Sequence, residues 1–397
     1  MKQTLQFVKN SLGFLFLFSF FFFACKSNDE VSPNAERTVL FYFAADNNLY
    51  SDISKDIQEI LKGMVGINGR VVIYIDGSNR TPMLLTVHQV ENKCVLDTIE
   101  TYPEENSVSW EVLKRVTHRV RELYPAASYG LVLGTHGSGW IPTGVQFPRT
   151  KAGNVAENRP RITRFLGVDN NFGTSTDQAV GIDVEDLVYA LPNGYEFIAF
   201  DVCLMGNIEV LYALRHKAKY ILASPGEIML RGFPYDQIVP FLWGGESELK
   251  QVCKLYRDYY EMNLEVRSNP WGMLSLVRTA YLDDLANSVK AILYGRKNEI
   301  AEMPVGEVWR YPLIDYTNDV FYDLREYIRK RATESQYLEF EQALTQVVYF
   351  TFTSKFASVE ISSDRCCGIA TYIPLNRWSI ANTQYDELEW TQYVYGQ

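Results

Sequence analysis

A histidine and a cysteine each follow a short apolar run in this sequence of 397 residues. His136 comes directly after residues 129–135, and Cys203 lies just beyond residues 197–200. Such runs are typical of buried parallel strands, and ligands of open α/β sheets bind at the carboxyl ends of these strands. A cysteine thiolate, a nearby histidine and an exposed backbone N–H are the groups that acyl transfer needs. The two positions are therefore a candidate nucleophile and a candidate base.

Each position also has an ordinary structural interpretation. Free cysteine is often buried, so Cys203 is equally a candidate core thiol, and His136-Gly-Ser-Gly has the composition of a tight turn. Two observations favour chemistry. A helix is predicted to start soon after Cys203, and its dipole would favour the thiolate. Glycines at positions 134, 137 and 139 would let the backbone near His136 approach a ligand closely. The other histidines fall in a hairpin or on helices, where solvated or capping roles are expected: His88, His118 and His216.

Alternating strand and helix patterns surround the two positions. The predicted strands are residues 39–43, 71–75, 129–135, 197–200 and 220–223, with a hairpin formed by 83–90 and 94–99. The predicted helices are residues 52–64, 107–124 with Ser107 as a cap, 183–191 and 208–215. This alternation indicates βαβ units and a largely parallel sheet.

The C-terminal part of the chain has a different pattern. Helices are predicted near residues 247–265, 281–297, 319–332 and 335–350, and strand-like stretches at 357–361 and 368–373. We therefore expect an α/β core at 37–240 and a largely helical region at 241–397 that returns strands to the core. The regular pattern is lost between Trp140 and Val180, and long segments of this kind usually carry function.

Composition excludes several classes of protein. A formal net charge of −10 argues against a nucleic-acid binder, and 47% hydrophobic with 22% charged residues allows a large core. Neither the paired spacing of a zinc site nor an EF-hand is present, so no metal site is predicted. The six cysteines give no readable disulfide pairing: Cys25, Cys94, Cys203, Cys253, Cys366 and Cys367.

The first 24 residues have the features of a secretory signal. Lys2 and Lys9 precede an apolar run at 12–24, which is shorter than the roughly 20 residues that a membrane span needs. Cys25 follows at once and resembles the lipobox cysteine of bacterial lipoproteins. We expect Cys25 to be lipidated and residues 25–36 to form a tether, which gives an exported protein anchored to a bacterial membrane, at the outer membrane or cell surface. The alternative is a plain signal peptide.

Several blocks of sequence resemble the clostripain family of cysteine peptidases. They are RTVLFYFAADNNL at 37–49, HGSGW at 136–140, FDVCLMGNIEVLY at 200–212, ASPGE at 223–227 and GFPY at 232–235. The stretch GIATYIP at 368–374 is similar to a late strand of that family. The order and spacing of the blocks match as well, and the likeness covers residue 37 to the C-terminus.

The resemblance implies a fold and a set of roles. The fold would be a caspase-like α/β/α sandwich with a mostly parallel sheet, and the activity cysteine endopeptidase hydrolysis without a cofactor. His136 would be the general acid/base, Cys203 the nucleophile, and the N–H groups of Gly137 and Cys203 the oxyanion hole. Asp201 matches the acidic residue that selects Arg or Lys before the scissile bond, although it is also a candidate cap for the following turn. Trp140 either lines the cleft or packs in the core.

Family members are commonly zymogens that cut themselves between the histidine and the cysteine. Four basic residues in this span are candidate sites for self-cleavage: Arg149, Lys151, Arg161 and Arg164. The alternative is a flexible insertion with ordinary surface charge. For the whole chain, the second hypothesis is a surface lipoprotein that keeps the caspase-like scaffold as a binding module without activity.

Overall fold

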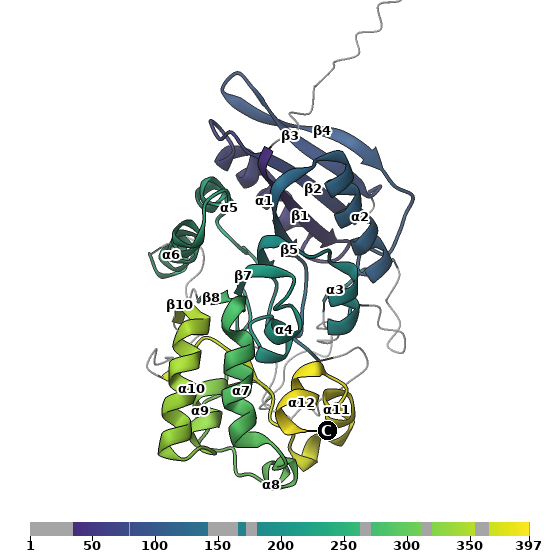
Figure 1. Cartoon of the computed structure of the whole chain (residues 1–397). Helices are drawn as coiled ribbons and strands as arrows, with labels where there is room; N and C mark the ends of the chain where they lie inside the picture. The colour runs from purple at the N-terminus through teal and green to yellow at the C-terminus, as the bar shows by residue number, and fades with distance from the viewer. Residues whose placement is uncertain are drawn as a thin grey trace, which may run out of the picture. The chain divides into compact units, whose positions relative to one another are not determined.

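A computed structural model describes residues 35–78, 80–141, 166–171, 181–262, 271–311, 320–353 and 365–396 (Figure 1). The strands are β1 (Ala35–Ala45), β2 (Arg70–Gly77), β3 (Met83–Val90), β4 (Lys93–Thr101), β5 (Ala126–Gly134), β6 (Tyr195–Asp201), β7 (Ala218–Ala223), β8 (Met273–Arg278), β9 (Tyr322–Asp323), β10 (Val348–Thr353) and β11 (Ala370–Thr371). The α-helices are α1 (Tyr50–Gly63), α2 (Trp110–Leu123), α3 (Val184–Ala190), α4 (Ile208–Ala213), α5 (Tyr235–Ile238), α6 (Glu246–Met262), α7 (Leu282–Leu293), α8 (Lys297–Ala301), α9 (Leu324–Arg329), α10 (Glu334–Val347), α11 (Ser379–Tyr385) and α12 (Glu389–Tyr395).

Nine strands form the main sheet, in the order β10-β8-β7-β6-β5-β1-β2-β3-β4. The five strands from β7 to β2 pair in parallel, and antiparallel strands extend both edges. The apolar runs that predicted these strands are buried, as expected for strands covered on both faces; Val39, Phe41 and Phe43 of β1 are fully enclosed. The predicted mostly parallel sheet is confirmed.

The direction of the strand order reverses between β1 and β5. From β1 the chain passes through α1 to β2 on one side, whereas from β5 it passes through α3 and α4 to β6 and β7 on the other. Helix α1 contacts α5, and α5 contacts α6; α2 contacts α3, and α3 contacts α4 (Figure 1). Such a switch point leaves a crevice at the carboxyl ends of the two strands. His136 follows β5, so the fold places this histidine at the crevice.

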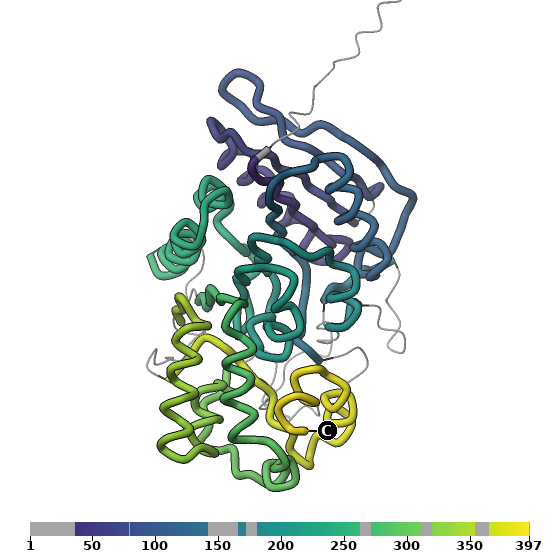
Figure 2. The backbone as a smooth tube through the Cα atoms, in the orientation of Figure 1, coloured from purple at the N-terminus to yellow at the C-terminus, as the bar shows by residue number. Residues whose placement is uncertain are grey.

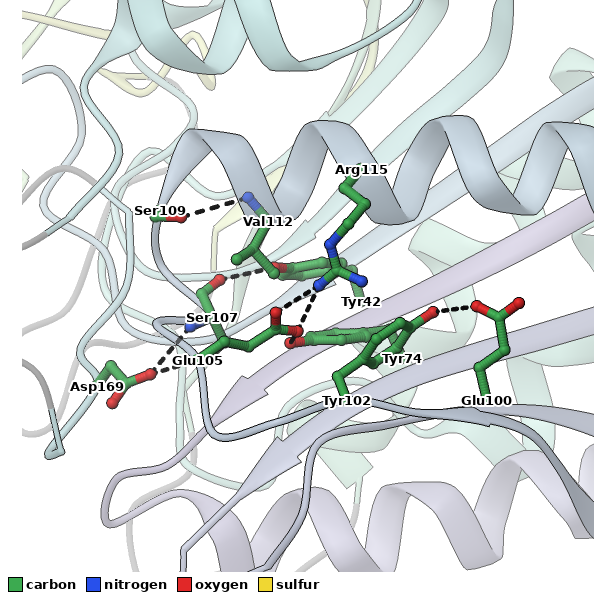
Figure 3. A network of polar contacts seen from close by, with 10 residues as sticks. All are labelled: Tyr42, Tyr74, Glu100, Tyr102, Glu105, Ser107, Ser109, Val112, Arg115 and Asp169. Atoms are coloured by element: carbon green, nitrogen blue, oxygen red, sulfur yellow. Dashed lines mark hydrogen bonds and ion pairs between the residues drawn. The ribbon is translucent and has the colours of Figure 1, made fainter.

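The N-terminus of α2 differs from the prediction. Ser109, not Ser107, is the N-cap, and its side chain accepts a hydrogen bond from the Val112 N–H at 3.3 Å (Figure 3). Ser107 is used elsewhere: its N–H and hydroxyl donate to Asp169 at 3.0 and 3.1 Å, and its carbonyl accepts from the Tyr42 hydroxyl at 2.7 Å. Ser107 was a plausible cap by residue type, but its bonds fasten the segment around Asp169 to the sheet.

The C-terminal region returns strands to the sheet, although not the predicted ones. β8 pairs antiparallel with β7, and β10 follows directly from α10 and pairs with β8. Of residues 368–373, only Ala370–Thr371 form a strand, which pairs with β9 in a separate two-stranded sheet; the predicted strand at 357–361 lies outside the described residues. The helix expected at 319–332 is shorter, at Leu324–Arg329. α12 lies against α4 and α7 (Figure 2).

Two further findings concern the segments that the structure describes. None of their helices is long and apolar enough to cross a membrane. Their cysteines are all free thiols, and the most enclosed are Cys253, Cys366 and Cys367. The predicted signal peptide at 1–24 and Cys25 lie outside the described residues.

Candidate active site

The histidine is held by the turn after β1 and by the segment after residue 165. Its ring Nε2 lies 2.8 Å from the Asn48 side-chain oxygen. Its carbonyl accepts a hydrogen bond from the Gly167 N–H at 2.8 Å, and Gly137 forms an antiparallel bridge with Leu166. The bond of this bridge therefore uses the His136 carbonyl and not the Gly137 N–H. Asn48 thus holds the ring of His136, and Gly167 holds its backbone.

The glycine turn after His136 is required by close packing. Gly139 has φ +70°, and a Cβ there would lie 2.6 Å from the Asn207 side-chain nitrogen. Trp140, which follows, is 1% exposed, and its ring centroid lies 4.9 Å from those of Tyr372 and Tyr385. Trp140 is thus a packing residue, and it fixes the turn against the C-terminal region.

The cysteine lies in a sharp turn between β6 and α4. Leu204, the next residue, has φ 65° although it is not glycine, and its N–H donates to the Gly226 carbonyl at 2.9 Å. Left-handed backbone at a non-glycine residue is costly and often marks a functional site. The Cys203 sulfur accepts a hydrogen bond from the Ile228 N–H at 3.3 Å. The turn therefore holds the thiol half-buried against the segment that follows β7.

The expected effect of a helix dipole on Cys203 is wrong. Helix α4 begins only at Ile208, so the thiol does not lie at its N-terminus. Burial, and secondarily the charge of Glu227, raise the pKa of Cys203 to about 12. Burial also lowers the pKa of His136 to about 4. At neutral pH both side chains are therefore uncharged in this structure.

A cavity of about 50 Å³ lies between the two strand ends. His136 and Cys203 both line it, and so do Asp201, Asp56 of α1 and Gly232. The fold thus brings the candidate base, the candidate nucleophile and the candidate specificity residue to one cavity. The two apolar runs predicted that His136 and Cys203 lie at the same edge of the sheet, whereas Asp201 was added by the family resemblance.

Asp201 is held with its carboxylate towards the segment before α5. One oxygen accepts hydrogen bonds from the Tyr235 hydroxyl at 2.8 Å and from the Phe233 N–H at 3.2 Å. A Cβ at Gly232, where φ is +56°, would lie 2.3 Å from the same oxygen. Burial raises the pKa of Asp201, while the bonds from Tyr235 and Phe233 act in the opposite direction. Both bonds are with the segment around the start of α5 and not with the turn that follows Asp201. A cap for that following turn, the alternative expected from the sequence, therefore does not account for the position of the carboxylate.

Two residues of the cavity region were not predicted. Asn48 belongs to the block at 37–49, whose neighbouring Asp46 and Asn47 the family resemblance places in a loop near the active site, but no contact with His136 was predicted for it. Asp56 falls within the predicted helix 52–64, and nothing in the sequence indicates that it lies near Cys203. Both positions depend on how α1 and the turn before it dock against the rest of the fold, α5 above all, which is a long-range property. The candidate cleavage residues fall outside the described residues: Arg149, Lys151, Arg161 and Arg164.

The parallel sheet, its helix layers and the paired strand ends define the caspase-like class of α/β/α folds. The Clostripain family model matches residues 41–395, so the chain belongs to the clostripain family. The predicted family and fold are confirmed.

Three relatives illustrate the range of the likeness. Clostripain of Hathewaya histolytica is 26% identical over 242 residues, which is 53% of this chain and 43% of that protein, so the match spans less than half of the relative. The structure of an inactive zymogen C11 protease from Parabacteroides distasonis has a TM-score of 0.76 and 29% identity, and covers 91% of this chain and 99% of its own. A secreted C11 cysteine protease from Bacteroides thetaiotaomicron, in complex with an irreversible peptide inhibitor, has a TM-score of 0.74 and 25% identity, with coverage of 91% and 100%.

Proposed function

We propose that this protein is a cysteine endopeptidase that hydrolyses peptide bonds after Arg or Lys. The observation that carries the proposal is the shared cavity, which His136, Cys203 and Asp201 line from the ends of two neighbouring parallel strands. Membership of the clostripain family supports it. The partner would be a peptide or protein with a basic residue before the scissile bond.

The chemistry starts from a neutral pair. A histidine N–H at Nε2 that donates to the Asn48 oxygen leaves Nδ1 unprotonated and able to take the Cys203 proton. The sulfur then attacks the substrate carbonyl carbon, and the N–H groups of Gly137 and Cys203 stabilise the oxyanion. His136 returns the proton to the leaving amine as the C–N bond breaks, which leaves a thioester on Cys203. Water attacks this thioester with His136 as base, and the acid product and the thiol are released.

Specificity for a basic residue would come from Asp201. A buried carboxylate forms strong charge-assisted hydrogen bonds with a guanidinium, and a neutral side chain would leave the carboxylate unpaired at a cost. The position of Asp201 on the cavity wall, two residues before the nucleophile, supports this assignment.

Fluorogenic peptide amides test the proposal. The substrates differ only in the residue before the cleaved bond: Arg, Lys or citrulline, the uncharged isostere of arginine. We expect turnover of the Arg and Lys substrates, none of the citrulline substrate, and none at all by Cys203→Ala. Cys253→Ala, which removes a fully buried thiol elsewhere, is the matched control and should stay active. An inactive wild type, even after limited proteolysis, would instead support the binding module.

We also propose that the protein is a zymogen that cuts itself after Arg149, Lys151, Arg161 or Arg164. The likeness to an inactive zymogen supports this. Wild type and Cys203→Ala, purified side by side, should differ on a denaturing gel, with fragments only in the wild type. Identical single bands would refute self-cleavage.

Export and membrane attachment are a separate proposal. Residues 1–24 would be removed as a signal peptide, and Cys25 would carry the lipid; a relative described as secreted supports export. Cells fed a radiolabelled fatty acid should label the wild type and not Cys25→Ser. Equal labelling of both would exclude Cys25 as the lipidated residue.

A further inference from the structure

Helix α1 contributes a second carboxylate to the cavity. Leu49, Ile53 and Asp56 follow one another at helical spacing, and all three line the cavity together with Asp201. Asp56 is 2% exposed. Carboxylates are almost never buried to this extent unless they are paired, because burial removes their hydration. The position of Asp56 therefore requires an explanation that an amphipathic helix does not give.

The hydrogen bonds of the two carboxylates differ. Asp201 has two donors from the segment around α5, at 2.8 and 3.2 Å. Among the residues that the structure describes, the Asp56 Oδ1 atom has no hydrogen-bond partner, although it is enclosed. An unsatisfied buried acceptor destabilises the fold and is usually explained by strain, function or a missing partner. The missing partner would be a donor that enters the cavity.

The charges around Asp56 leave room for one more cation. Arg231 is the nearby basic residue, and it pairs with Glu59 at 2.5 Å, one turn further along α1. The charges that act on Asp56 are thus those of three carboxylates and a single guanidinium: Asp52, Glu59, Asp201 and Arg231. A basic side chain in the cavity would offset this excess of negative charge.

We infer that Asp56 is a second specificity-determining residue, which binds the basic side chain of the substrate opposite Asp201. The inference rests on the proposed function for the identity of this ligand. A guanidinium presents five N–H donors in a planar fork, so it can bond to carboxylates on two sides, whereas an ammonium is a point charge. Two carboxylates on different walls therefore favour Arg over Lys.

The present cavity must widen to take this side chain. At about 50 Å³ it has room for only a few water molecules, far below the roughly 300 Å³ at which ligand pockets begin. Ile228, Met229, Leu230 and Gly232 also line the cavity, in a segment without regular secondary structure, and Leu230 is about half exposed. Asp56 lies within the regular helix α1, so we expect the irregular segment to yield and Asp56 to keep its place.

Proton release on ligand binding would distinguish a binding role of Asp56 from a structural one. Burial above all, and then the charges of Asp201, Glu59 and Asp52, raise its pKa far above that of an ordinary carboxyl, while Arg231 acts in the opposite direction. In the empty site at neutral pH, Asp56 therefore holds a proton. A guanidinium that enters would displace this proton, so binding of an arginine peptide should release protons.

Isothermal titration calorimetry on Cys203→Ala protein tests the inference without turnover. The ligands are two peptide amides that end in arginine or in citrulline, each titrated near neutral pH in buffers of different ionisation enthalpy. Asp56→Asn in this background should weaken the arginine peptide about 10- to 100-fold, leave the citrulline peptide little changed and abolish proton release. Asp52→Asn is the matched control, since it removes one carboxylate from the same helix, where Asp52 pairs with exposed Lys55.

The outcomes separate this inference from the proposed function. It is overturned if the Cys203→Ala parent does not prefer arginine to citrulline, if Asp56→Asn leaves the arginine affinity unchanged, or if it weakens both peptides equally. The proposed function fails on a different measurement, the turnover of arginine amides by protein with Cys203 intact. Arginine binding that depends on Asp56, without any turnover, would uphold the site and refute the peptidase.

Discussion

Glu209 connects the nucleophile side of the sheet to the C-terminal region, and its replacement gives a sharp test of the electrostatics. It lies in the first turn of α4 and is 1% exposed. One carboxylate oxygen accepts three hydrogen bonds of 3.0 Å, from the Thr371 hydroxyl, the Tyr372 N–H and the Tyr385 hydroxyl. Burial outweighs these bonds and raises the pKa of Glu209 from 4.5 to about 7.

The raised pKa predicts how stability depends on pH. The folded protein holds a proton on Glu209 that the unfolded chain loses above pH 4.5, so this contribution is complete below pH 4.5 and is lost as pH rises to about 7. At about 1.4 kcal/mol for each pKa unit, the loss is about 3 kcal/mol. Glu209→Gln keeps the shape and the accepting oxygen but does not titrate. The variant should therefore gain about 3 kcal/mol relative to wild type between pH 4.5 and 7.

Urea unfolding followed by tryptophan fluorescence at several pH values measures this change. The measured quantity is the difference in free energy of unfolding between Glu209→Gln and wild type, and only its change with pH is compared. A pH-independent effect of the substitution therefore does not matter. Glu209→Ala is the second variant: it leaves the three donors unsatisfied and should cost about 3–5 kcal/mol at pH 4.5. Because alanine does not titrate either, this cost should shrink by about 3 kcal/mol as pH rises to 7. A difference between wild type and Glu209→Gln that stays flat from pH 4.5 to 7 would refute a raised pKa at this site.

Three further predictions concern the cap, the cavity and the base. Ser109→Ala should lower the free energy of unfolding by about 1 kcal/mol through loss of the α2 cap, and an unchanged urea midpoint would contradict the cap. Gly232→Ala places a Cβ against Asp201 at a positive φ and should lower kcat/KM for an arginine substrate roughly tenfold or more, whereas unaltered kinetics would show that the segment adapts freely. His136 must be neutral to act as a base, and its pKa is lowered to about 4. At saturating arginine substrate, where Asp56 and Asp201 already pair with the guanidinium, kcat should therefore hold through pH 6.5 and fall only near pH 4. A fall centred near pH 6.5 would mean that the active form exposes His136 to water.

The regular part of the sheet could be predicted from local pattern alone. Three inner parallel strands contain the apolar runs at 39–43, 129–135 and 197–200. A strand that is covered on both faces is apolar along its whole length, so it can be recognised without knowing its neighbours. β8 was missed because it lies within a region of helical pattern and joins the sheet only at its edge, beside β7. Its place depends on tertiary pairing that a local window does not contain.

Some residues of the cavity could be predicted from the sequence and others could not. That His136 and Cys203 would lie near one another followed from the rule that parallel strands end at one edge of a sheet. The contributions of Asn48 and Asp56 did not follow, because their types and spacing suit a polar turn and a solvated helix face equally well. Asp56 is enclosed only because α1 docks against α5 and the segment before it, and no residue near Asp56 in the sequence signals this docking.

Residues 166–171, which follow the candidate cleavage region, are bound to the turn after β1 and to His136 by their own hydrogen bonds. The Gly167 N–H bonds to the His136 carbonyl at 2.8 Å, the Asn47 side chain donates to the Val168 carbonyl at 2.8 Å, and the Asn171 N–H donates to an Asp46 oxygen at 3.2 Å. A cut between residues 142 and 165 would therefore not release this segment. β5 and β6 lie on opposite sides of such a cut in sequence, yet they are neighbouring inner strands of one sheet. Cleavage would thus break the covalent link between β5 and β6 while the histidine and the cysteine keep their places.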